Sequence, residues 1–168
     1  MANQTAVSSL IGANLSSSDT TALFALGTRI NSTDGGVFQY AEATSTFITG
    51  ELVLLNPTST AKTLLTALLT AGTQGINIAA AQNIINQGEF GWFATQGRNL
   101  YILCTGTCTA GSELGFGFAA NSGRLQSVAA VGVASTALGF FITTSASTAT
   151  ESVAVGTLTW PRAVTMGS

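Results

Sequence analysis

The chain has 168 residues, of which only 7% are charged (five Lys and Arg, seven Asp and Glu), and its formal net charge is −2; an ordinary soluble domain carries about 25% charged residues. This balance excludes the clustered basic side chains that nucleic-acid binding requires, and the absence of histidine removes the commonest general base and every histidine-containing zinc site. With 46% hydrophobic residues and two prolines, the chain is also unlike a disordered segment, and it is long enough to bury a core without a disulfide.

The N-terminal segment, residues 1–20, is polar and rich in Ser, Asn and Ala, with a small apolar group at Leu10, Ile11 and Leu15. It has neither the basic region nor the apolar stretch of a secretory signal. Two interpretations stay open: a frayed terminus, or an arm whose apolar group anchors it on a neighbouring subunit. The remaining residues, 21–168, are expected to form one β-rich domain.

The first part of this domain has the residues and turns of a β protein. Strands are expected at Leu23–Ile30, at Val37–Ala43 and at Glu51–Asn56, the last ended by Pro57. Between the first two, the run Asn31–Gly36 (NSTDGG) predicts a tight hairpin turn, because its Asp-Gly pair supplies the positive φ that such turns require.

The stretch Ala61–Ala71 (AKTLLTALLTA) is ambiguous. Its leucines have a helical spacing, whereas its threonines favour a strand, and Gly72 is a suitable helix stop. The stretch Ile76–Ile85, rich in Ala and Ile, is equally undecided. At most one or two short helices are therefore expected in the whole chain.

The second half has short apolar runs separated by Gly- and Ser-rich turns. Within Leu114–Ala120, Leu and Phe alternate with Gly and Ala, so one face is smooth enough for another layer to approach closely. The densest apolar run, Val128–Ile142, has about 15 residues, fewer than the ~20 of a membrane-spanning helix, so no membrane partner is expected. Regular short strands predict a single, mainly β domain, a β-sandwich or barrel, behind the N-terminal arm. The expected strands are Phe90–Gln96, Arg98–Thr105, Leu114–Ala120, Val128–Val133, Gly139–Thr143 and Val153–Trp160.

Residues for catalysis or for a cofactor are missing from the sequence. Without histidine the usual serine triad cannot be built, and the only lysine, Lys62, has no SxxK motif around it. The glycine-rich runs match no phosphate-binding loop, and the seven carboxylates are scattered, as edge charges are. We therefore expect no enzyme activity, no cofactor and no metal. Cys104 and Cys108, in CTGTC, are expected to be reduced thiols, although a turn at Gly106 leaves a disulfide open.

The low charge is the main indication of function. A surface of Ser, Thr, Asn, Gln, Gly and Ala is easily desolvated, which suits a protein that packs against its own copies or a large partner. Aromatic and Arg side chains are over-represented at interfaces, although core packing is the simpler explanation for the tryptophans. Four arginines are expected at strand ends, placed for bidentate pairing with a neighbour's carboxylate: Arg29, Arg98, Arg124 and Arg162. The candidate interface comprises Leu10, Ile11, Leu15, Trp92, Phe93, Arg98, Trp160 and Arg162.

Several segments resemble β-rich structural proteins of tailed bacteriophages. Leu26–Val53 is similar to their opening hairpin, and Gly75–Gly97 to their small-residue run that ends in a Gly-Trp strand. The segments SGRLQSVA and LTWPR (Leu158–Arg162) resemble their closing turn-strand and last strand, whereas the SSSDTT lead-in and CTGTC depart from the pattern. The resemblance implies a capsid decoration, or cement, protein, which binds the outside of the expanded head and clamps neighbouring major capsid subunits.

On this interpretation the partners are the major capsid protein and further copies of the chain, as a homotrimer, with no nucleic acid and no membrane. The protein is expected on the capsid exterior of the virion, assembled in the host cytoplasm. Two alternatives stay open. One is another virion structural protein, such as a tail-tube, head-fibre or receptor-binding protein, and the other is a carbohydrate-binding module that uses Trp92 or Trp160.

Overall fold

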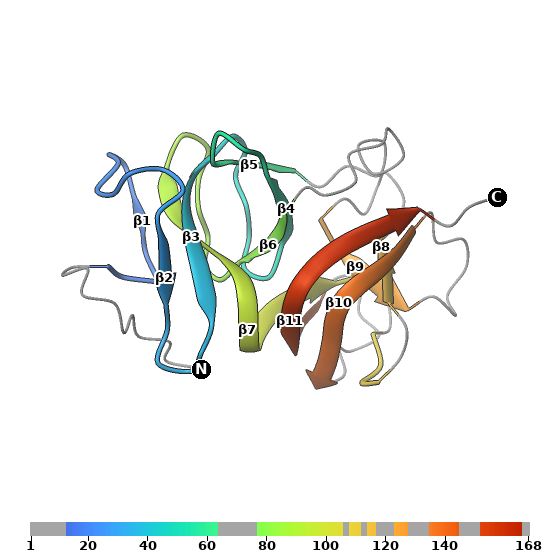
Figure 1. The fold of residues 1–168 in the computed structure, drawn as a ribbon. Coiled ribbons are helices and arrows are strands. Elements are labelled where there is room, and N and C mark those ends of the chain that lie inside the picture. The colour runs from blue at the N-terminus through green and yellow to red at the C-terminus, as the bar shows by residue number, and fades with distance from the viewer. Residues whose placement is uncertain are drawn as a thin grey trace.

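The computed structural model (Figure 1) describes residues 13–63, 77–105, 108–111, 114–116, 123–127, 135–144 and 152–165. These residues contain eleven strands and no helix, so the expected mainly β, barrel-like domain is confirmed. The strands are β1 (Ser18–Asp19), β2 (Arg29–Asn31), β3 (Val37–Ala43), β4 (Leu52–Leu55), β5 (Thr60–Thr63), β6 (Asn77–Ala81), β7 (Phe90–Cys104), β8 (Leu114–Phe116), β9 (Leu125–Ser127), β10 (Ser135–Thr144) and β11 (Ser152–Thr165).

Five of these strands close into a small barrel. The order around it is β3, β7, β6, β4, β5 and back to β3, and every pairing is antiparallel except β3 with β5. In Figure 1 these strands lie in the left half of the molecule, with β1 and β2 further to the left. Closure pairs both edges of each barrel strand, which removes the unpaired edges that an open sheet would expose.

One set of alternating positions on the barrel strands fills its interior. This cluster draws only on the five barrel strands and two loop residues, Phe47 and Ile85, which form an isolated bridge at one end. Half of its members are alanines, because the inside of so narrow a barrel leaves little room for larger side chains. The cluster consists of Ala41, Ala43, Phe47, Val53, Leu55, Ala61, Ala79, Ala81, Ile85 and Phe93.

The other faces of the barrel strands are buried as well, in a second and larger core. On one side Tyr40 and Trp92 pack against Phe24, with ring centroids 5.0 to 5.3 Å apart. The chain segment that covers them is the described part of the expected arm, where Leu15 is 4% exposed and β1 pairs with the start of β7. Residues 13–20 therefore belong to the domain, and residues 1–12, with Leu10 and Ile11, lie outside the described part.

Strand β7 connects the barrel to the right half of the molecule. Its first half closes the barrel, and its second half pairs with β11, which in turn pairs with β10 (Figure 1). The sequence predicts two strands here, and the structure has one, bent where Gly97 (φ 147°) and Asn99 (φ 55°) have positive φ. A Cβ on Gly97 would lie 2.9 Å from Gly36 Cα, so the bend requires glycine.

The predicted hairpin is confirmed, since β2 and β3 flank a turn in which Gly35 has φ 76°. The strand expected at Leu23–Ile30 is wrong for most of its length, because residues 23–28 are irregular with a turn at 26–27, and only Arg29 and Ile30 belong to β2. The two undecided stretches contain β5 and β6, and the remaining residues of the first, 64–71, lie outside the described part. Residues 117–120 and the strand expected at 128–133 also lie outside the described part. Strand β9 falls within SGRLQSVA, where only the resemblance implied a strand.

Candidate functional site

Three of the predicted interface residues are buried within the chain itself. Trp92 is 1% exposed and Phe93 is fully buried, so both belong to the core, as the simpler interpretation held, and Leu15 joins them. A sugar ring has no access to the indole of Trp92, which removes stacking on that residue as a binding mode. The backbones of Trp160 and Arg162 belong to β11, and their side chains lie outside the described part.

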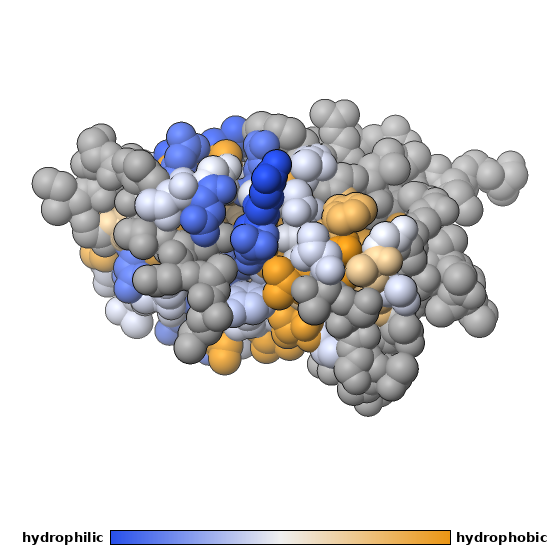
Figure 2. All heavy atoms as spheres, turned by 90° about the horizontal axis from the view of Figure 1, so that it is seen from below, coloured by the Kyte–Doolittle hydropathy of each residue, from blue (hydrophilic) through white to orange (hydrophobic). Residues whose placement is uncertain are grey.

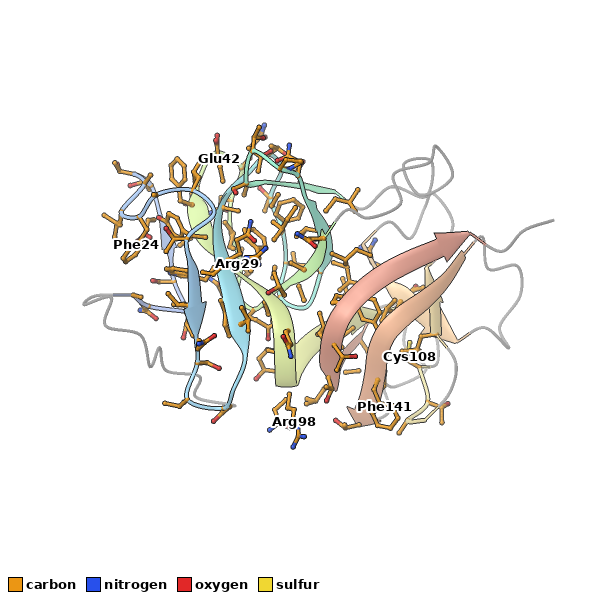
Figure 3. All side chains as sticks on the ribbon, viewed as in Figure 1. Phe24, Arg29, Glu42, Arg98, Cys108 and Phe141 are labelled. Atoms are coloured by element: carbon orange, nitrogen blue, oxygen red, sulfur yellow. The ribbon has the colours of Figure 1, made fainter. Side chains whose placement is uncertain are left out.

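Arg98 is the one predicted interface residue whose described side chain is exposed. It projects from the bend of β7 at the lower edge of the molecule in Figure 3, on the same side as Phe141 of β10, which is 57% exposed. Figure 2 views the molecule from this side and shows hydrophobic side chains gathered next to strongly hydrophilic ones. Of the predicted set, Arg98 alone is thus placed to touch a partner through a described side chain.

The side chains of Glu89, Cys104 and Cys108 form hydrogen bonds within the fold. The pKa of Glu89 is lowered by a hydrogen bond from the Ser18 hydroxyl (2.6 Å), which links β1 to the residue before β7, and by further bonds from the backbone and side chain of Asn86. Cys104 and Cys108 are both buried as free thiols, and the pKa of Cys104 is raised by a hydrogen bond with Cys108 and by burial. Within the described residues, no three His, Cys, Asp or Glu side chains gather as metal ligands would, and no helix is suited in length and apolarity to cross a membrane.

A hollow of about 440 Å³ opens at one end of the barrel interior. On β3, β4 and β6 it is lined by Gln39, Leu55 and Asn77, which continue the alternation of the inward-facing residues of those strands. Such a volume lies within the range of about 300–1,000 Å³ typical of small ligand sites. The remaining lining residues come from the β2 strand, the loop before it and the β4–β5 turn: Gly27, Arg29, Asn56, Pro57 and Ser59.

Arg29 supplies the only charge among these lining residues, and a chain of hydrogen bonds holds it. Arg29 lies directly opposite Gln39 in the β2–β3 pairing, and its Nε donates to Gln39 Oε1 (3.0 Å). The Gln39 amide, 6% exposed, donates in turn to Ser59 Oγ (3.3 Å). The terminal nitrogens of the guanidinium have no hydrogen-bond partner in the described part of the chain, and Figure 3 places Arg29 in front of the barrel strands.

The turn between β4 and β5 fixes Ser59 in place. Asn56 Oδ1 accepts hydrogen bonds from the Thr58 hydroxyl (2.8 Å) and the Thr60 backbone N–H (3.0 Å), so the side chain closes the turn. Ser59 adopts φ 58°, which non-glycine residues adopt rarely, and a Cβ on Gly27 would lie 2.7 Å from its Oγ. The unusual backbone conformation of Ser59 and the lack of space for a side chain at Gly27 indicate that this wall of the hollow is closely packed.

Comparison with protein-family models, with curated proteins and with solved structures found no match to this chain. What the hollow can bind therefore follows from the chemistry of the residues around Arg29. A guanidinium whose two terminal nitrogens remain for a ligand, neutral amides and a partly apolar wall can bind an anion, and the described lining residues include no nucleophile paired with a base.

Proposed function

We propose that this chain is a non-enzymatic structural protein of a tailed-phage virion, a decoration or cement protein that binds the outside of the head as a homotrimer. Each copy would bridge neighbouring major capsid subunits. Many weak contacts, repeated over the shell, would together stabilise it against internal pressure.

The observation that carries this proposal is the scarcity of charge on a chain of this size. Only 12 of 168 side chains are charged, since the sequence holds five Lys and Arg and seven Asp and Glu. Surfaces of this composition are easily desolvated and suit stable contact with other polypeptide. The phage-like segments support the same proposal, as does the barrel, a rigid core without exposed edges that suits a mechanical role.

Exposed apolar side chains give the proposal candidate contact points. Large hydrophobic residues that are at least 38% exposed occur in the loop before β2, in the two loops joined by the Phe47–Ile85 bridge, and on β10 and β11. Single residues of this kind are normal on any surface, and a contact surface requires several of them together. They are Leu23, Leu26, Ile48, Ile84, Phe141 and Val153.

Binding to purified heads tests this function directly. The chain is incubated with expanded, undecorated phage heads, the heads are sedimented, and the bound copies are counted and located by cryo-electron microscopy; sedimentation velocity gives the oligomeric state. A fixed stoichiometry on the outer surface and a trimer are expected. Assembly of the free protein into rings or tubes would instead support a tail-tube role, and a monomer without affinity for heads would overturn the proposal.

A further inference from the structure

We propose that the hollow at Arg29 is a carboxylate-binding site that takes the side chain of a glutamate or aspartate. The identity of the polypeptide that presents this carboxylate rests on the proposed function, which makes it a capsid subunit or a second copy of the chain. The existence of the site rests only on the geometry around Arg29.

The guanidinium is held in position before any ligand arrives. Its Nε is occupied by Gln39, whose own amide is buried and bonded to Ser59, so one edge of the exposed Arg29 side chain is tied to β3. The two terminal nitrogens remain for a ligand. Two parallel N–H groups match the two oxygens of a carboxylate, and a side chain already ordered loses less conformational entropy when it binds.

The charge around the hollow favours a single negative charge. Among its described lining residues Arg29 alone is charged, and the other polar side chains are the neutral Gln39, Asn56, Ser59 and Asn77. A phosphate group carries nearly two charges at neutral pH and is usually bound by several cations or by a run of backbone N–H groups. One arginine among amides balances one carboxylate.

The walls of the hollow also suit an amino-acid side chain. The exposed Pro57 and the largely buried Leu55 line the same hollow as Arg29 and make part of its wall apolar. The methylene groups of a glutamate or aspartate side chain can contact this surface while the carboxylate reaches Arg29. A bare inorganic anion would leave it unused.

Nuclear magnetic resonance measures the site without any capsid. The sequence has four arginines, so an ¹⁵N spectrum of the arginine Nε–H groups has few signals, and Arg29→Lys assigns the relevant one. The folded protein is titrated with N-acetyl-glutamate amide, with acetate and with inorganic phosphate at equal ionic strength. Arg29→Gln tests the site, and Arg98→Gln, which removes an exposed arginine on β7 that does not line the hollow, is the matched control.

We expect the glutamate derivative to shift the Arg29 Nε signal saturably, more strongly than acetate or phosphate does. Arg29→Gln should weaken binding at least about tenfold, Arg29→Lys should weaken it as well because lysine lacks the fork, and Arg98→Gln should leave it unchanged. Equal shifts with all three anions, or binding that survives Arg29→Gln, would overturn the site.

Sedimentation with phage heads then separates the site from the proposed function. If wild type binds heads and Arg29→Gln, still folded by circular dichroism, binds at least about tenfold more weakly, the carboxylate belongs to the shell interface. If wild type binds no heads while the glutamate derivative still binds at Arg29, the function fails and the site stands. If Arg29→Gln, still folded by circular dichroism, binds heads as wild type does, the assignment of the site to the shell is wrong.

Discussion

Tyr40 joins the N-terminal segment to the barrel, and its replacement by phenylalanine isolates that connection. The phenol donates a hydrogen bond to Asp19 Oδ2 (2.9 Å) and accepts one from the Leu23 backbone N–H (3.2 Å). The ring lies in the aromatic cluster, with its centroid 5.0 Å from that of Trp92 and 5.3 Å from that of Phe24. Because Tyr40→Phe keeps the ring, it removes the two hydrogen bonds and leaves the packing.

The size of the effect follows from these two bonds. A hydrogen bond to a charged group contributes about 1.5–3 kcal/mol and one between neutral groups about 0.5–1.5 kcal/mol. Asp19 is half-buried and Leu23 is exposed, so water replaces part of both bonds in the variant. We expect Tyr40→Phe to lower the free energy of unfolding by about 2 kcal/mol, and therefore the Tm by about 4–8 °C for a chain of this length.

Urea unfolding followed by tryptophan fluorescence measures this difference. The matched control is Tyr101→Phe, which alters the only other tyrosine, a half-buried residue whose hydroxyl has no hydrogen bond within the described residues. The control should change the free energy of unfolding by less than about 0.5 kcal/mol. If the two variants were equally stable, the Tyr40 hydroxyl would not fasten the N-terminal segment, and the reasoning would be refuted.

Three further predictions concern pH and the glycines. Burial raises the pKa of the Tyr40 phenol to about 12, so the contribution of the neutral phenol to folding stability is complete below about pH 10 and is lost as the pH rises through the pKa of the folded state. Wild type should therefore lose stability over this alkaline range, and Tyr40→Phe should lack that loss. Hydrogen bonds from Ser18 and Asn86 lower the pKa of Glu89, so the contribution of its carboxylate to folding stability is complete above the ordinary pKa of glutamate and is lost as the pH falls below that value. Between about pH 5 and pH 3 the Tm should therefore fall less in Glu89→Gln than in wild type, and an equal fall would contradict this prediction. Gly50 has φ 85° and an added Cβ would lie 2.7 Å from a β7 backbone nitrogen, whereas Gly88 has φ 80° and open space around it. In urea unfolding, Gly50→Ala should therefore lower the free energy of unfolding by at least about 2 kcal/mol more than Gly88→Ala does. Equal losses would exclude the steric clash as the cause.

Local chemistry made part of the fold predictable. The Asp-Gly pair fixed the β2–β3 hairpin, and strand-forming residues gave β3 with its observed bounds. Barrel closure was not predictable in the same way, because it depends on pairings such as β3 with β5 that join separated segments. The sequence also suggests a break at Gly97, and only the position of β11 beside both halves of β7 makes that glycine a bend inside one strand.

The candidate site was predictable only in part. Arg29 was expected at a strand end and able to pair with a carboxylate, but its fixed orientation depends on register with Gln39 and on Ser59, twenty residues further along the chain. Nothing local distinguished Trp92 in the core from Trp92 at an interface, since both environments favour aromatic residues. A usable signal was present in the alternating alanines Ala41 and Ala43, whose spacing marks the inward face of a narrow barrel.

The barrel also changes what the scarcity of charge means. Strands β3, β4 and β6 are buried on both faces, so almost none of their positions tolerates a charged side chain, whatever the protein binds. Part of the low charge therefore comes from the fold itself, and only the part on exposed loops and on the outer faces of β10 and β11 bears on partners. Charge introduced at those outer positions, such as Phe141→Lys, should leave the fold intact and weaken only binding that uses that face, whereas the same charge inside the barrel should prevent folding.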